Sequence, residues 1–180
     1  MTFLNVLYSS TNTQRKSGRA SSSQKEDFEA LYAVACDPLI WEQHPSSDRY
    51  KEEVFREFFR QAMESCGAFL VRDTKSGEAI GSSRFAYYNE AESQIEIGWS
   101  FLARSYWGGK YNGEMKRLML EHAFQFVDSV VFFVGVGNIR SQGAMEKISG
   151  VQIKSTNDEN GRPHFVYQIT RSAFEERKNE

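Results

Sequence analysis

The stretch YWGGKYNGEMKRLML, residues 106–120, combines two adjacent glycines and a third at Gly113 with a helical pattern of apolar residues that follows them. The free main-chain N–H groups at the start of a helix, together with the positive end of its dipole, can bind a phosphate group. Glycines let the main chain approach a ligand closely, and Lys110 adds a positive charge. A simpler interpretation stays open, because Glu114 in the first turn stabilises a helix start by itself.

Two common phosphate-binding motifs do not fit this loop. A dinucleotide-binding G-x-G-x-x-G ending at Gly113 requires a glycine at 110, where the chain has Lys110. A Walker loop requires Lys and then Ser or Thr after its last glycine, where the chain has Glu114 and Met115. The loop therefore predicts neither of these nucleotide-binding folds.

The residues before the loop predict two helices followed by three strands. Apolar residues at helical spacing after residue 24 and across residues 48–67 indicate the helices. Stretches 68–72, 79–88 and 94–102 have strand-forming residues and short turns between them, which is typical of an antiparallel meander.

The residues after the loop predict a helix, a buried strand over 130–136, a short helix over 141–148 and two final strands. The whole order predicts a single α/β (α+β) domain, with a mixed, mostly antiparallel sheet and helices on both faces. We expect this domain to span residues 24–172. Residues 1–23 are predicted as an irregular arm or a weak first strand near residues 3–8, and 173–180 as a polar tail.

Composition sets limits on location and partners. With 22 basic and 24 acidic residues the net charge is -2, so no overall attraction to nucleic acid or to an anionic membrane is expected. The longest apolar run, over 130–137, is much shorter than the roughly 20 residues of a membrane-spanning helix. Cys36 and Cys66 form no CxxC motif, which favours a reducing compartment, the cytoplasm. No spacing of His, Cys or acidic residues suggests a metal site.

The motifs together resemble those of a known superfamily. A strand over 95–102, the loop WGGKYNGE, a helix, the strand VFFVGVGN and the pattern N-x-R-S…EKISG occur in the order found in GCN5-related N-acetyltransferases, the GNAT superfamily. The similarity runs from about residue 27 to residue 169, and the chain looks like the branch that includes the ribosomal-protein N-terminal acetyltransferases. The resemblance implies acetyl-CoA as cosubstrate and a sheet in which the two strands beside it splay apart. It also implies transfer of the acetyl group to a primary amine, of a protein N-terminus or a small molecule, by direct attack in a ternary complex.

The resemblance also implies where acetyl-CoA binds. The pantetheine arm would pair with main chain around Phe101, Leu102 and Ala103, and Asn138 would hydrogen-bond this arm or brace the splayed strands. The pyrophosphate would lie on the loop, at Gly108, Gly109, Lys110, Tyr111, Asn112 and Gly113. Four residues depart from the family pattern. In the loop, Trp107 and Asn112 stand at the first and last motif positions and Lys110 stands where a glycine is usual; Met145 stands near the position of a tyrosine acid in many relatives.

Two residues are candidates for catalysis. Glu96 lies on the strand beside the expected cofactor groove, where a carboxylate among apolar residues can have a raised pKa and accept the proton of the amine. Its alternative is a solvent-facing strand residue. Ser141 would lie near the thioester sulfur in similar proteins, and its alternative is the N-cap of its helix.

The acceptor amine has four candidate contacts. Trp41 and His44 would line its pocket, although a simple turn before Pro45 is an alternative for His44. Arg84 and Tyr87 would face the acceptor channel, although alternation along their strand also allows solvent or core. The chain is expected to act as a monomer or homodimer. An alternative function is a non-catalytic acyl-CoA binding or sensor protein of the same fold, which Lys110 and Met145 motivate.

Overall fold

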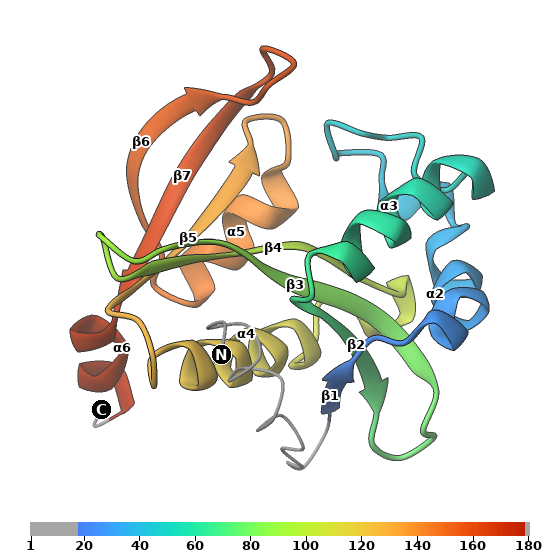
Figure 1. The fold of residues 1–180 in the computed structure, drawn as a ribbon, viewed down its shortest axis with the longest axis horizontal. Helices are drawn as coiled ribbons and strands as arrows, with labels where there is room; N and C mark the ends of the chain where they lie inside the picture. Colours follow the sequence, from blue (N-terminus) through green and yellow to red (C-terminus); the bar gives the residue numbers. More distant parts are fainter. Residues whose placement is uncertain (1–17, 179–180) are drawn as a thin grey trace.

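The structure is a computed structural model in which residues 18–178 are described (Figure 1). The weak strand predicted near residues 3–8 lies outside these residues. No helix in the described range has the length and apolar character that crossing a bilayer requires.

The described residues form a seven-stranded sheet in the order β1-β2-β3-β4-β5-β7-β6. Its strands are β1 Gly18–Ser22, β2 Ala68–Asp73, β3 Ala79–Asn89, β4 Gln94–Leu102, β5 Ser129–Gly135, β6 Val151–Asn157 and β7 Pro163–Thr170. All neighbours are antiparallel except β4 and β5, which are parallel because α4 connects them. The prediction of a mixed, mostly antiparallel sheet is confirmed.

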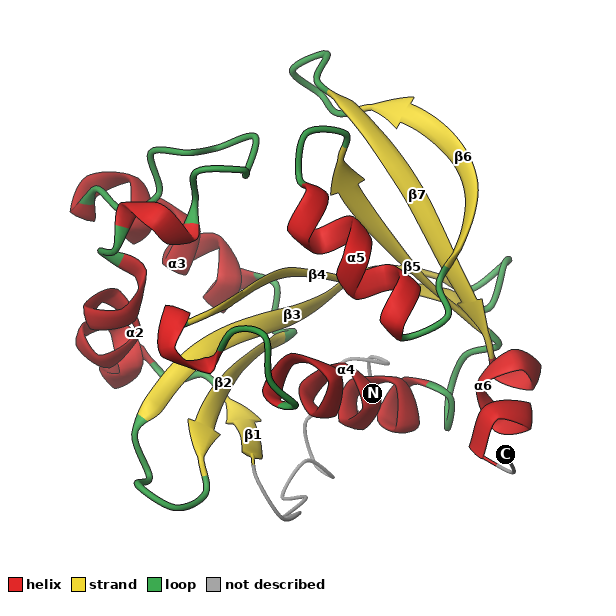
Figure 2. Cartoon of the chain, turned by 180° about the vertical axis from the view of Figure 1, so that it is seen from behind, coloured by secondary structure: helices red, strands yellow, loops and turns green. Residues whose placement is uncertain are grey.

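Helices cover both faces of this sheet. They are α2 Phe28–Ala35, α3 Glu52–Glu64, α4 Tyr111–Ala123, α5 Ile139–Lys147 and α6 Arg171–Lys178. Helices α2 and α3 lie on one face, and α4 and α5 lie on the other, as the view from behind in Figure 2 shows. Each face has its own apolar core, one built around α4 and the other around α2 and α3.

The side chains of β4 are divided between these two cores. Ile95 and Ile97 belong to the α4 core, and Phe101 belongs to the α3 core. The alternation shifts at Trp99, which has a φ of 52°, and the register with β3 shifts at the same place, between Ser82 and Arg84. This is a β-bulge, a device that redirects side chains and bends a strand.

Both ends of the described chain are more regular than the sequence predicts. β1 lies within the predicted irregular arm, where it pairs with β2. Helix α6 covers most of the predicted polar tail and is attached to the fold by several contacts. The Arg171 guanidinium donates to the Val127 carbonyl at 2.8 Å, and the Phe174 ring packs 5.2 Å from that of Phe124. One aromatic residue among charged ones is too weak a signal to predict such a helix.

Candidate functional site

β4 and β5 pair only at their beginnings. Gln94, Ile95 and Glu96 pair with Ser129, Val130 and Val131. Beyond Glu96 the described strands form no further pairs with each other, although β4 continues to Leu102 and β5 to Gly135. The two strands therefore diverge, and their separation is visible in Figure 2.

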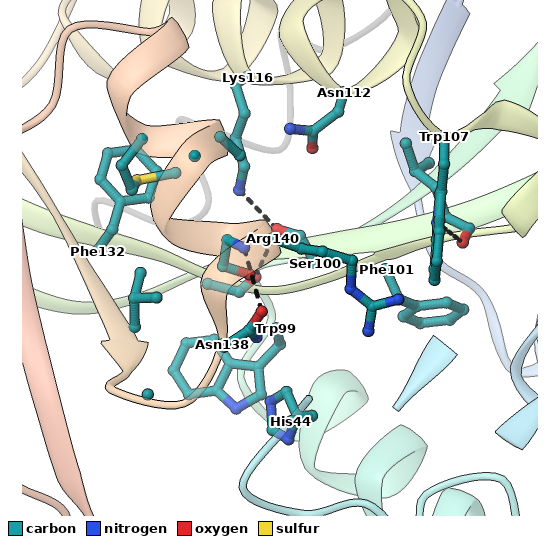
Figure 3. Close-up of a pocket in the computed structure, with 18 of the residues that line it drawn as sticks. His44, Trp99, Ser100, Phe101, Trp107, Asn112, Lys116, Phe132, Asn138 and Arg140 are labelled. Carbon is teal, nitrogen blue, oxygen red and sulfur yellow. Dashed lines mark hydrogen bonds between the residues drawn. The ribbon is translucent and has the colours of Figure 1, made fainter. Parts of the chain in front are cut away.

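A pocket of about 610 Å³ lies where β4 and β5 part. Its walls include β4 from Ile97 to Leu102, β5 from Phe132 to Gly135, the glycine loop and the start of α5 (Figure 3). This volume is within the range of roughly 300–1,000 Å³ that is usual for small-molecule sites. The divergence thus produces a cavity large enough for a substantial ligand.

The glycine loop presents free main-chain donors to this pocket. Within the described chain, the N–H groups of residues 108–113 have no protein acceptor, whereas the N–H groups of Trp107 and Glu114 on either side donate to Arg104 and Lys110 carbonyls. Gly108 has a φ of 71°, which only glycine adopts without strain. A Cβ added to Gly109 or Gly113 would meet no protein atom within 4 Å, and both residues line the pocket. These glycines keep space free beside unpaired donors, an arrangement that fits a diphosphate.

Not every loop residue faces the pocket. Gly108, Gly109, Asn112 and Gly113 line it, but Lys110 and Tyr111 do not. The Tyr111 hydroxyl donates to Asp73 Oδ2 at 3.0 Å and its ring packs 4.7 Å from that of Tyr106, so this side chain is held against the protein.

The predicted pantetheine segment is also partly engaged by the protein. Phe101 and Leu102 line the pocket, but Ala103 does not, and its N–H donates to the Ile80 carbonyl at 2.8 Å. The Leu102 carbonyl accepts a hydrogen bond from Trp107 Nε1 at 2.9 Å. A bound pantetheine arm could use the Leu102 carbonyl only in competition with this indole.

Asn138, rather than Ser141, is the N-cap of α5. The N-cap of α5 is Asn138, whose Oδ1 accepts from the Ser141 N–H at 3.1 Å. The N-cap interpretation of Ser141 is therefore wrong, because the helix starts two residues earlier than the sequence suggests. Both residues line the pocket, and within residues 18–178 the Ser141 hydroxyl forms no hydrogen bond, so it can contact a ligand.

Glu96 is buried, with 8% of its surface exposed, so its interpretation as a solvent-facing strand residue is wrong. It is the last residue of β4 that pairs with β5. Burial raises the pKa of its carboxyl to about 7, although nearby Arg84 and Lys116 favour the charged form. A Cβ on Gly98 would lie 3.0 Å from Glu96 Oε1, so the carboxylate lies against a part of β4 that has no side chain.

Arg84 and Tyr87 do not line the pocket. Arg84 is buried, its guanidinium carbon lies 3.9 Å from the centroid of the Trp99 ring, and burial lowers its pKa to about 10. Among the described residues, its Nε has no hydrogen-bond partner. Tyr87 is 76% exposed and packs on the outer side of Trp99 at 5.8 Å. Trp99, which both residues contact, does line the pocket.

Trp41 and His44 both line the pocket. Trp41 is fixed by the hydrogen bond from its Nε1 to the Ala35 carbonyl at 2.7 Å. His44 also has a turn role, since its Nδ1 accepts from the Ser46 N–H at 2.9 Å. Burial, with Arg49 and His164 nearby, lowers the pKa of His44 to about 3, which keeps its ring neutral.

The pocket wall also contains residues that the sequence analysis does not predict, Arg140 and Lys116 among them. The Arg140 guanidinium stacks 4.2 Å from the Trp107 ring centroid and donates to the carbonyls of Leu39 and Ile40. Lys116, on α4, is 4% exposed and also lines the pocket. Helical spacing could have predicted that Lys116 points inward, because it shares a helix face with Leu120 and Ala123, both of which are buried.

Comparison with protein families identifies the fold. A sequence model described as "Acetyltransferase (GNAT) domain" matches residues 22–150, more than half of the chain. The chain belongs to the GNAT acetyltransferase family. It is an acyltransferase of that family, and the superfamily predicted from the loop and helix motifs is confirmed. No curated protein sequence matches this GNAT chain.

Solved GNAT structures share the fold at low sequence identity. A GNAT-family acetyltransferase from Bacillus anthracis is 20% identical, with a TM-score of 0.74 over 88% of this chain and 98% of that one. Mycobacterium smegmatis RimJ in complex with CoA-disulfide is 15% identical, with a TM-score of 0.69 over 86% and 82%. Spermidine N-acetyltransferase from Vibrio cholerae, in complex with CoA and spermine, is 16% identical, with a TM-score of 0.68 over 87% and 97%.

Proposed function

We propose that this GNAT protein transfers the acetyl group of acetyl-CoA to a primary amine by direct attack within a ternary complex. One observation carries the proposal: unpaired main-chain N–H groups of residues 108–113 border the pocket that opens where β4 and β5 part. Preorganised donors at a helix start suit a pyrophosphate. The CoA complexes of RimJ and of the spermidine acetyltransferase, which have this fold, support the choice of cosubstrate.

Residues along the pocket would hold acetyl-CoA in a definite order. The amides of Gly108, Gly109 and Gly113 would bind the pyrophosphate, with Asn112 beside them. The pantetheine arm would follow β4 along Phe101 and Leu102. Asn138, through the amide nitrogen that does not cap α5, would contact this arm from the opposite wall, with Ser141 nearby.

Glu96 is the best candidate for the general base. Glu96 lies at the closed end of the divergence, where the pairing of β4 with β5 stops. This position, together with a pKa of about 7, suits a group that must accept a proton near neutral pH. Glu96 does not line the pocket itself, so it would take the proton of the amine through a bridging water. Main-chain N–H groups of β4 near Phe101 and Leu102 would stabilise the negative charge that develops on the carbonyl oxygen.

The acceptor would enter on the α3 face, past Trp41, His44 and Trp99, all of which line the pocket. Arg84 and Tyr87 would act indirectly by packing on Trp99. Both a protein N-terminus and a small-molecule amine fit this account. RimJ and the spermidine enzyme resemble the chain to about the same degree, so neither kind of acceptor is favoured by likeness.

Thermal shift and thiol release test the proposal together. Coenzyme A should raise the melting temperature, and acetyl-CoA should release thiol faster in the presence of an accepted amine, from a panel of peptides and polyamines, than without one. Stabilisation by coenzyme A without any amine-dependent thiol release across the panel would favour a non-catalytic acyl-CoA sensor. No stabilisation at all would contradict the cofactor assignment.

A further inference from the structure

Lys116 is a charged group inside the pocket to which the proposed function gives no task. Lysine is almost never fully buried unless it is paired, because removing an ammonium from water is costly. Lys116 is 4% exposed, and within the described chain it forms no ion pair within salt-bridge distance. Proteins often keep such a buried charged group, despite the cost of removing it from water, where the group has a chemical role.

The contacts of Lys116 place it in the gap between the diverging strands. Its Nζ donates to Ser100 Oγ of β4 at 2.6 Å and lies 5.3 Å from the centroid of the Phe132 ring of β5 (Figure 3). Ser100 directly follows the bulge at Trp99, and its Oγ shares a hydrogen bond of 2.7 Å with Ser83 Oγ. Nζ therefore has one close partner, a hydroxyl, and further donor capacity toward the pocket.

Lys116 and Glu96 lie on opposite faces of the sheet. Lys116 projects from α4, on the face where the glycine loop opens that helix. Glu96 interacts with Arg84, whose guanidinium lies 5.8 Å from the Phe58 ring in the core of α2 and α3. The two groups thus approach the point where β4 and β5 part, Lys116 from the cofactor side and Glu96 from the acceptor side.

We propose that Lys116 is a catalytic residue that donates a proton to the thiolate leaving from acetyl-CoA. This inference rests on the proposed function. When the amine nitrogen bonds to the acetyl carbon, the C–S bond breaks and its electron pair stays on sulfur. The Lys116 ammonium gives one proton to that sulfur and becomes a neutral amine, while Glu96 holds the proton lost by the attacking nitrogen. Transfer of that proton to Lys116 through solvent restores both groups, and the products are an amide and free coenzyme A.

The electrostatics of the site agree with this role. Burial lowers the pKa of Lys116 to about 7, and Glu96 is the charged group that opposes the shift. The other polar groups against Nζ are the hydroxyls of Ser100 and, through it, Ser83, and Phe132 and Met145 offer no charge. An ammonium with a pKa near 7 is a stronger acid than an ordinary thiol of pKa about 8.5, so the proton moves downhill to sulfur. Met145, at the position where a family tyrosine was expected, cannot supply it.

Binding of coenzyme A itself tests the proposal without turnover. We would measure the pKa of the bound thiol by ultraviolet absorbance of the thiolate, in the wild type, in Lys116→Met and in Arg117→Met as a control on the outer side of the same helix. Below about pH 7, where Lys116 keeps its proton, the wild type and the control should hold about tenfold or more bound thiolate than Lys116→Met, equivalent to one unit or more in the pKa of the thiol beside an ammonium. Desulfo-CoA, which lacks the sulfur, should bind equally to all three.

Kinetics provide the second readout. With a saturating amine, Lys116→Met should lower kcat by about 10²-fold or more and abolish the fall in rate that the wild type shows as pH rises above about 7. Equal amounts of bound thiolate below pH 7 in the wild type and in Lys116→Met would overturn the proposal while leaving acetyl transfer intact. Acetylation of Lys116 itself, detected by peptide mass spectrometry, would also overturn it, because the amine would then be a nucleophile. Failure of coenzyme A to bind any variant would instead contradict the proposed function.

Discussion

Two buried side chains of opposite charge, Glu96 and Lys116, lie on opposite faces of the sheet near the point where β4 and β5 part. On the α3 face Glu96 lies near Arg84, and on the α4 face Lys116 lies between Ser100 and Phe132. Burial raises the pKa of Glu96 to about 7 and lowers that of Lys116 to about 7, so each group is brought near neutral pH from the opposite direction. Under the proposed mechanism, each face would handle one proton of the acyl transfer: that of the amine on the α3 face and that of the thiol on the α4 face.

Glu96→Gln should have the largest effect, because it removes the base of the acceptor face while keeping the size of the side chain. We expect kcat to fall by about 10² to 10⁴. In the wild type the rate should rise with pH through about 7 as the carboxyl ionises, and this rise should be absent in the variant. Steady-state kinetics across pH would test both effects, with Glu92→Gln in the exposed turn as the control. A wild-type rate would remove Glu96 from the mechanism.

Gly109→Val should weaken the cofactor side without disturbing the acceptor side. The new side chain would meet no protein atom within 4 Å at its Cβ and would instead occupy pocket space beside the free amides. We expect the Kd for coenzyme A to rise about tenfold or more, equivalent to at least ~1.4 kcal/mol, with a smaller change in kcat at saturation. Calorimetric titration would measure this, with Gly137→Val, also in open space but outside the pocket, as the matched control. Unchanged affinity would contradict the role of the loop.

The stability of the two charge variants should depend on pH in opposite senses. The folded state raises the pKa of Glu96 from 4.5 to about 7, so stability from this group is lost as pH rises through 7. Glu96→Gln should therefore gain melting temperature relative to the wild type on the alkaline side. The folded state lowers the pKa of Lys116 from 10.5 to about 7, so wild-type stability from this group increases as pH rises from 7 to 10.5.

Lys116→Met should accordingly show its largest relative gain below about pH 7. Thermal melts from about pH 5 to pH 9 would compare the slopes, with differences of about 2–4 °C for each kcal/mol in a domain of this size. Parallel slopes for the two variants would show that the two faces do not differ in the way described.

Ser141→Ala and Asn138→Ala should have the smallest effects, and they separate helix capping from contact with the cofactor. Asn138 caps α5 through Oδ1, so its loss should destabilise the protein by about 1 kcal/mol. Ser141 contributes only its N–H to this cap, and alanine retains that group. Ser141→Ala should therefore change the free energy of unfolding by less than ~0.5 kcal/mol. Denaturant unfolding of both variants would test this. A larger loss for Ser141→Ala than for Asn138→Ala would contradict the capping assignment.

Much of the fold follows from local patterns. The strand over 94–102 and the glycine loop before α4 were predicted because alternation and helix-start residues are sequence-local signals. The divergence of the strands was predicted only from the family resemblance, because no sequence pattern indicates where β4 and β5 cease to pair. The bulge at Trp99 is likewise invisible, because a positive φ at tryptophan is imposed by the surrounding fold.

The site was harder to predict than the fold. Glu96 was found by its place on a strand, but its burial depends on Gly98 and on the cover of α3. Lys116 was missed because a charged residue is normally assigned to the outer face of a helix, and only the buried Leu120 and Ala123 on the same face reveal its direction. Trp107 and Arg140 meet across the pocket from distant parts of the chain, a contact that no spacing predicts.

A crystal structure of the complex with coenzyme A would test the central claim most directly. The account predicts the pyrophosphate oxygens within about 3 Å of main-chain nitrogens of residues 108–113, and the sulfur at the closed end of the divergence, between Glu96 and Lys116. A pyrophosphate bound elsewhere, with these amides left in solvent and the gap between β4 and β5 empty of the pantetheine arm, would contradict it.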